Sequence, residues 1–130
     1  MTRAEALDSF SVDESAGTLD WKHHGAAVHV VVPGLVTADA YREQAVVLAL
    51  LQEMPTLQAT LLKVFSADGS ECFELQPPAG FFFYYLTRHI EMPIAVVCVT
   101  ANGAPFDHWH DWQFGVDLQK RTLQRIGPAY

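Results

Sequence analysis

Residues 28–44 read VHVVVPGLVTADAYREQ, and this stretch decides the expected fold because its hydrophobic period changes within a few residues. The β-branched run favours a strand that ends at Pro33 and Gly34, where the chain loses a backbone donor and gains conformational freedom. Thr37 then offers its hydroxyl to the first unpaired amides of a helix. The stretch therefore predicts a strand that leads through one tight turn into a helix, which is typical of α/β proteins.

The flanking segments extend this alternation of strands and helices. Residues 18–23 and 26–32 predict a β-hairpin that turns at Gly25. Residues 38–54 predict an amphipathic helix that ends before Pro55, because apolar side chains recur in them every three or four positions. These apolar positions are Tyr41, Ala45, Leu48 and Leu51.

The second half of the chain continues in the same way. Residues 57–65 and 72–75 predict two further strands. Residues 81–86 read FFFYYL; the aromatic side chains favour a strand, whereas the position between two strands favours a crossover helix, and we expect the helix. The nearly unbroken apolar run 94–100 predicts a central strand that is covered on both faces. Residues 105–126 predict a closing amphipathic helix.

The composition fits one compact domain. Half of the 130 residues are apolar and 18% are charged. We expect residues 18–130 to form a single α/β domain, a mixed four- to five-stranded sheet with helices packed on it, and residues 1–17 to form a loosely ordered acidic arm. The formal net charge of −7 argues against a nucleic-acid partner, because phosphate contacts need clustered Lys and Arg.

The cysteines and the apolar runs bear on the cellular compartment. Cys72 and Cys98 lack the CxxC spacing of redox and metal sites, so we expect reduced thiols in a cytoplasmic protein. The sequence shows no apolar leader and no run of about 20 apolar residues. We therefore expect no insertion into a membrane.

The order of the predicted elements resembles the STAS fold, and within it the SpoIIAA-like (STAS/SEC14) family, which is related to anti-sigma-factor antagonists. The likeness rests on GLVTADAY at residues 34–41, LKVF at 62–65 and IAVV at 94–97. Glu74-Leu75 and Arg88-His89 follow in the order that the family shows. This resemblance implies a module that binds a partner without catalysing a reaction.

Residues 76–80 depart from that family. STAS antagonists that switch partners carry a phosphorylatable Ser or Thr at the start of the second helix, where this chain reads QPPAG. Without a hydroxyl, phosphate charge cannot be added at that place. The chain also resembles the first half of a crotonase domain, but it lacks the two glycine-rich turns that would present an oxyanion hole.

The aromatic run at residues 81–86 marks the expected binding surface. Its five consecutive aromatic side chains cannot all face inward from one helix, so some should meet a partner, a ligand or another part of the chain. Because an exposed aromatic patch favours association, we expect a homodimer through this segment. The candidate binding residues are Phe81, Phe82, Tyr84, Tyr85, Arg88, His89, Trp109 and His110.

Asp107, His108, His110 and Asp111 form the richest group of possible metal ligands. On a helix the two histidines point about 200° apart, and the helix dipole accounts for the acidic residues, so we expect no metal and no other cofactor. An extended segment would instead put both histidines on one face. No pattern indicates a nucleophile with its base, and we expect no catalytic residue.

These observations favour a non-catalytic STAS-like binding or regulatory module that lacks the phosphorylatable residue. Its partner would be another protein or a small apolar ligand, bound at residues 76–88. The alternative is a carrier or enzyme for a small apolar ligand, including a degenerate crotonase-like domain. In that case Phe82, Tyr85 and Trp109 would line the pocket, and His89 or His110 would carry the proton.

Overall fold

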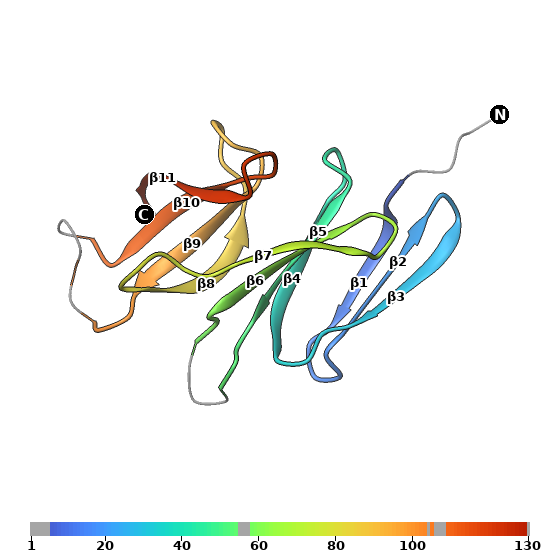
Figure 1. Cartoon of the computed structure of the whole chain (residues 1–130), viewed down its shortest axis with the longest axis horizontal. Coiled ribbons are helices and arrows are strands. Elements are labelled where there is room, and N and C mark those ends of the chain that lie inside the picture. The colour runs from blue at the N-terminus through green and yellow to red at the C-terminus, as the bar shows by residue number, and fades with distance from the viewer. Residues whose placement is uncertain (1–5, 55–57, 104, 106–108, 130) are drawn as a thin grey trace.

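The computed structural model describes residues 6–54, 58–103, 105 and 109–129, and these residues form eleven strands and no helix. The strands pair antiparallel and form three sheets that follow one another along the chain. Figure 1 shows these sheets side by side, from β1–β3 through β4–β7 to β8–β11. The described chain is therefore all-β, and the expected α/β fold with helices packed on a sheet is wrong.

Each sheet is a meander in which consecutive strands pair. The first sheet consists of β1 (Asp8–Asp13), β2 (Thr18–His23) and β3 (Ala26–Val31). The second sheet consists of β4 (Leu35–Tyr41), β5 (Val46–Leu51), β6 (Leu61–Ser66) and β7 (Glu71–Leu75). The third sheet consists of β8 (Phe81–Thr87), β9 (Ala95–Thr100), β10 (Asp111–Asp117) and β11 (Thr122–Pro128). The first strands of the sheets are neighbours, because β1 lies beside β4 and β4 beside β8. Adjacent blades of a β-propeller resemble this arrangement.

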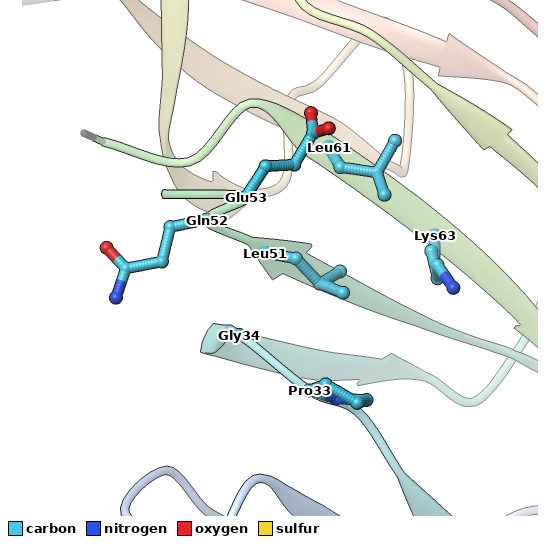
Figure 2. A pocket seen from close by; sticks show the side chains of 7 residues that line it. All are labelled: Pro33, Gly34, Leu51, Gln52, Glu53, Leu61 and Lys63. Atoms are coloured by element: carbon cyan, nitrogen blue, oxygen red, sulfur yellow. The ribbon is translucent and has the colours of Figure 1, made fainter. Parts of the chain in front are cut away.

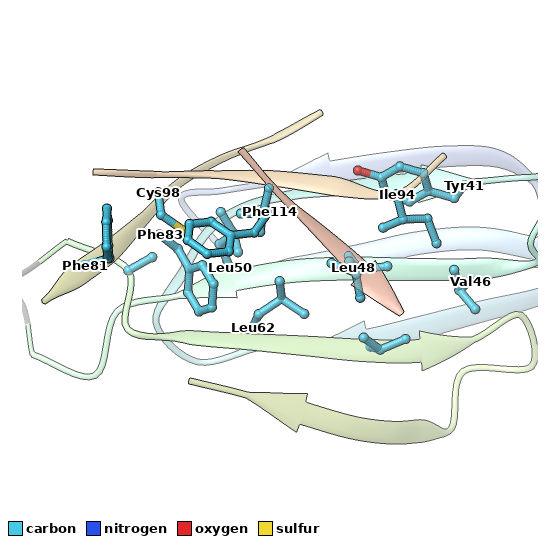
Figure 3. Packing of buried hydrophobic residues seen from close by; sticks show 14 of the residues in the cluster. Tyr41, Val46, Leu48, Leu50, Leu62, Phe81, Phe83, Ile94, Cys98 and Phe114 are labelled. Atoms are coloured by element: carbon cyan, nitrogen blue, oxygen red, sulfur yellow. The ribbon is translucent and has the colours of Figure 1, made fainter. Parts of the chain in front are cut away.

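Strand β5 is buried on both faces. Alternate residues from Val46 onward pack in the core between the second and third sheets, and those from Val47 onward pack in the core between the first and second sheets. No residue of β5 is more than 8% exposed. In Figure 3, Phe83 and Phe114 of the third sheet lie near Leu50 of β5. Because a fully buried Leu or Val contributes about 1.5–3 kcal/mol, these two cores hold the three sheets together.

The first and second sheets are linked by a close backbone crossing at Pro33 and Gly34. Gly34 has a φ of +79°, and its carbonyl accepts a hydrogen bond of 2.8 Å from the amide of Gln52. A Cβ at position 34 would overlap the Gln52 carbonyl oxygen. The tight turn expected here thus exists, but it joins strands of two different sheets instead of a strand and a helix.

The turn between β6 and β7 packs the second sheet against the first. The indole Nε1 of Trp21 donates a hydrogen bond of 2.7 Å to the carbonyl of Ala67. Gly69 has a φ of +95°, and a Cβ on it would lie 2.7 Å from Cγ1 of Val28. The turn therefore has no room for a side chain where it meets β3.

The helix expected at residues 38–54 is wrong. This segment contains the end of β4, a turn and β5. Ala45 lies in the turn with a φ of +57°, which a right-handed helix does not allow. The three- and four-residue spacing arose because every position from 46 to 51 is apolar, and such a run fits a strand that is covered on both faces.

The two other expected helices are also wrong. Residues 81–86 belong to β8, so the preference of aromatic side chains for strands prevails. Within the range 105–126, β10 places alternate residues from Trp112 onward in the core. The carboxylate of Asp117 then closes a turn by accepting hydrogen bonds from the amides of Gln119 and Lys120, at 3.0 and 2.9 Å.

The predicted strands are confirmed where the structure describes them. Strands β2 and β3 form the predicted hairpin, and β6, β7 and β9 overlap the segments predicted to be extended. Residues 8–13, inside the segment predicted to be an acidic arm, form β1. The resemblances to the STAS fold and to crotonase are wrong, because both require helices between strands that here are joined by turns and loops.

Candidate functional site

The predicted binding residues of β8 lie on different surfaces. Phe81 is buried in the core between the second and third sheets. Phe82 and Tyr85 pair with Val99 and Val97 of β9, whose side chains point away from that core. The structure therefore brings Phe82 and Tyr85 onto one face of the third sheet and Phe81 onto the other.

Tyr84 lies at a β-bulge, because the register of β8 on β9 shifts between Phe83 and Tyr85. Its ring contacts that of Tyr85 with the centroids 5.0 Å apart. It also lines a cleft of about 300 Å³ between the second and third sheets. The other residues that line this cleft are Val36, Gln52, Gln58, Ala59 and Phe83. This volume is at the lower limit for ligand pockets in proteins, which is about 300 Å³.

Arg88 joins the third sheet to the second. Its guanidinium donates hydrogen bonds to the carboxylate of Asp39 at 3.0 Å and to the carbonyl of Ala40 at 2.9 Å. It also lies over the ring of Tyr41, 4.5 Å from the centroid. Burial, together with the nearby Asp39 carboxylate, raises the pKa of Tyr41, whose hydroxyl donates to the carbonyl of Thr87 at 2.9 Å. These contacts give Arg88 a structural role.

His89, Trp109 and His110 lie beyond the ends of the strands. Nδ1 of His89 accepts a hydrogen bond of 3.0 Å from the amide of Glu91, in the loop between β8 and β9. At the opposite end of the sheet, Nε2 of His110 lies 3.1 Å from the carbonyl oxygen of Gly103. Because β8 spans about 20 Å at 3.3 Å per residue, the structure does not bring His89 together with Trp109 and His110.

The outer face of the third sheet is apolar in its middle. The side chains of Ile94, Val96 and Cys98 pack in the core, so those of Ala95, Val97 and Val99 point to the outer face. The strand register adds further residues to this outer face, which are Phe82, Tyr85, Thr87, Gln113 and Gly115. The two charged positions of β10 on this face, Asp111 and Asp117, are the ends of the strand. The area between them is uncharged.

The middle of this outer face is covered by the chain itself, because Ala95, Val97 and Gly115 are buried. Met92 of the loop between β8 and β9 lies over Gly115, where its side chain fills the space that a Cβ would need. Tyr85 remains 41% exposed, and Ile90 in the same loop is 99% exposed. Two large apolar side chains therefore reach solvent in and next to the outer face, as Val31 does on the first sheet.

The outer face of the first sheet is polar by contrast. β2 alternates, with Leu19 and Trp21 in the core and Asp20 and Lys22 outside. The carboxylate of Asp20 lies 2.6 Å from Nδ1 of His29 on β3, and both side chains are about half exposed. This alternation is typical of a sheet with one face in water.

A larger cleft, of about 510 Å³, lies beside the crossing at Pro33 and Gly34. Its two charged groups already have partners, because Lys63 pairs with Glu71 at 2.9 Å and Glu53 accepts a hydrogen bond from Thr60 at 2.8 Å. Figure 2 shows that the side chains of Glu53 and Lys63 do not point toward a common centre. The cleft thus lacks the convergent polar groups of a ligand site.

Catalytic and metal-binding arrangements find no support in the described residues. They contain no group of three His, Cys, Asp or Glu side chains that could hold a metal ion. Asp107 and His108 of the predicted ligand cluster lie outside them. Hydrogen bonds from the hydroxyls of Ser66 and Ser70 hold the pKa of Asp68 far below its usual value. The amide of Ser70 also donates to this carboxylate at 2.9 Å, so Asp68 closes the turn between β6 and β7.

Of the residues on this outer face, the sequence-based prediction named Phe82 and Tyr85 but not Val97, Val99 or Met92. A signal was available, because the unbroken apolar run at residues 94–100 predicted a strand covered on both faces. Only the crossover-helix interpretation of residues 81–86 kept that run from being assigned to the same surface as the aromatic side chains.

Comparisons with known proteins identify no relative of this chain. No protein-family model, no curated protein and no solved structure matches this chain. The described residues contain no helix that is long and apolar enough to cross a membrane.

Proposed function

We propose that this protein is a non-catalytic binding module that docks another protein on the outer face of the third sheet. Two exposed apolar side chains at this face carry the proposal, because Tyr85 of β8 is 41% exposed and Ile90 in the following loop is 99% exposed. The β9 side chains beneath them, Ala95 and Val97, are fully buried within the chain. Exposed apolar groups that lie together mark sites of interaction.

The residue types of the outer face support this function. Tyr85 and Phe82 present rigid aromatic rings, which lose little conformational entropy when a partner covers them. Aromatic residues, Tyr and Trp above all, are also the types on which binding energy is most often concentrated at protein interfaces. Val97 and Val99 lie beside these rings and provide an apolar floor.

Photo-crosslinking in cells that naturally contain the protein tests this proposal. Benzoylphenylalanine replaces Tyr85 on the outer face, and the control replaces Ser11, which is exposed on β1 of the opposite end sheet. We expect a discrete protein adduct from position 85 and none from position 11. Adding Phe82→Lys should remove the adduct, because a buried unpaired charge destabilises an interface. Equal labelling at positions 85 and 11, or none at position 85, would contradict the proposal.

A carrier for a small apolar ligand is the second candidate, favoured by the cleft that Tyr84 lines. Its walls include Val36, Ala59 and Phe83, which suit an apolar molecule. Native mass spectrometry of protein purified from its own host distinguishes the two functions. A bound small molecule that is lost after Ala59→Leu, which fills the cleft, would favour the carrier.

We also propose a cytoplasmic location. Both cysteines are free, with Cys72 exposed and Cys98 buried. Free thiols persist in a reducing compartment. An alkylation assay on intact cells would show whether Cys72 stays reduced there.

A further inference from the structure

We infer that the outer edge of β3 binds an extended segment of another protein, which completes the first sheet as its fourth strand. The second and third sheets have four strands each, whereas the described residues give the first sheet three, in the order β1-β2-β3. No described residue pairs with β3 on the side away from β2. This edge belongs to the first sheet and not to the third (Figure 1), so the inference goes beyond the proposed function.

The main chain of β3 presents hydrogen-bonding groups along this edge. The amide of Val32 donates a hydrogen bond of 2.7 Å to the carbonyl of Gly17 on the side of β2. Because bonded pairs alternate in an antiparallel ladder, Val30 and Val28 also bond to β2, and the residues between them direct their N–H and C=O groups outward. These outward residues are Ala27, His29 and Val31. An extended backbone matches such a row of donors and acceptors.

β3 lacks the residues that protect the corresponding edges of the other two sheets. β7 carries Glu71 and Glu74, and β11 carries Arg125 and Pro128. Charged side chains and proline discourage an edge strand from pairing with another chain. β3 reads AAVHVV, without lysine, arginine, carboxylate or proline, and Val31 is 64% exposed. The first sheet is therefore open to a further strand.

The second sheet is uncovered where that further strand would lie. On one face of β7, Phe73 and Leu75 pack against the core between the second and third sheets, together with Leu123 of β11. By alternation, Cys72 and Glu74 point from the other face of β7 toward the first sheet, and both are exposed. A fourth strand beside β3 would cover this face of β7 as β11 covers the opposite one.

The side chains around this gap indicate the chemistry of the bound segment. The cleft of about 510 Å³ lies between the end of β3 and β6, where Pro33 and Leu61 form apolar walls (Figure 2). Lys63 pairs with Glu71 at 2.9 Å, and the exposed Glu74 adds a further negative charge on the same face. A segment with apolar residues at alternate positions and at least one Lys or Arg complements this surface. Its main chain would supply the affinity, so convergent polar side chains are not needed.

Photo-crosslinking from two positions of β3, in cells that naturally contain the protein, tests the inference. Benzoylphenylalanine replaces Ala27 in one variant and Val31 in another, because both residues are exposed and lie on the same face of β3. Mass spectrometry of the adducts identifies the crosslinked residues of the partner. We expect both positions to label one segment of one partner protein, at sites about four residues apart, because paired strands advance residue by residue.

Two substitutions of His29 separate main-chain binding from side-chain effects. His29→Pro removes the central outward N–H and should lower the yield of both adducts at least about fivefold, because a carbonyl of the bound segment loses its donor. His29→Gln loses the imidazole and its contact with Asp20 as well, but it keeps the N–H and should retain both adducts. An edge strand tolerates proline where its N–H faces outward, and circular dichroism checks the fold. Ala27→Pro, assayed from position 31, replaces His29→Pro if that variant does not fold.

Four results would overturn the inference. These are the absence of an adduct from both positions, labelled sites that lie in different partners or far apart in one, adducts that survive His29→Pro, and an adduct within the chain or with a second copy. Phe82→Lys should leave the adducts of β3 unchanged. The adduct from position 85 reports on the outer face of the third sheet alone, so failure of this inference is distinguishable from failure of the proposed function.

Discussion

The close backbone crossing at Pro33 and Gly34 allows a quantitative prediction of the free energy of unfolding of glycine variants. Gly34 combines a positive φ of +79° with a backbone so close to Gln52 that a Cβ would overlap the Gln52 carbonyl oxygen. Gly25 and Gly80 have nearly the same φ, +82° and +86°, but a Cβ on either would meet nothing within 4 Å. The three glycines therefore separate the cost of the backbone conformation from the cost of the close approach.

We expect Gly25→Ala and Gly80→Ala to lose about 1–2 kcal/mol each, which is the cost of a left-handed conformation in an L-residue. Gly34→Ala adds the displacement of the Gln52 carbonyl, at roughly 1–3 kcal/mol for overpacking, and should lose about 2–5 kcal/mol in total. Urea denaturation measures these differences, and Tm should fall by roughly 4 °C for each kcal/mol. If Gly34→Ala were no less stable than the two controls, the close crossing between the sheets would be refuted.

Three further experiments test the burial of β9, the turn at Asp68 and the hydrogen bond of Tyr41. Burial raises the pKa of the Cys98 thiol to about 12. One equivalent of a thiol reagent should therefore label exposed Cys72 in the native protein at pH 8, and a second equivalent should label Cys98 only after unfolding. Rapid labelling of both cysteines in the native protein would contradict the burial of β9. The lowered pKa of Asp68 gives stability above about pH 4 that is lost as the pH falls toward that pKa, so Asp68→Asn should make stability decline less steeply on acidification, as measured by Tm from pH 2 to 7. Tyr41→Phe removes the hydrogen bond to the Thr87 carbonyl and should cost about 1–3 kcal/mol in urea denaturation, and an unchanged midpoint would show that water replaces it.

Local turn chemistry was predictable from the sequence, whereas the partner of each apolar run was not. The hairpin at Gly25 followed from two strand-forming segments on either side of a glycine, and the structure forms it. Residues 46–51 were ambiguous because an apolar run satisfies a helical stripe and a doubly covered strand equally well. The structure excludes the helix at Ala45, whose positive φ interrupts it. This conformation could not be predicted, because alanine, unlike glycine, has no preference for a positive φ.

The arrangement of the candidate site also could not be predicted from local sequence alone. The aromatic residues of 81–86 were identified as a binding surface, but their division between two faces depended on strand geometry. The bulge at Tyr84 depends on the register of β8 on β9, which no pattern in β8 alone specifies. Arg88 looked like part of the same site, but its partners Asp39 and Ala40 are more than 45 residues earlier in the chain.

The hydrophobic period of a strand can be compared with the number of its faces that are covered. β2 alternates apolar and polar residues, and one of its faces is covered. β5 is apolar throughout, and sheets lie against both of its faces. β9 has the period of β5, yet it lies in an end sheet like β2. Ala95 and Val97 on the outer face of β9 are nevertheless fully buried, and Met92 of the loop between β8 and β9 packs over neighbouring Gly115. The apolar period of β9 therefore fits a strand covered on one face by a sheet and on the other by side chains and a loop of its own chain.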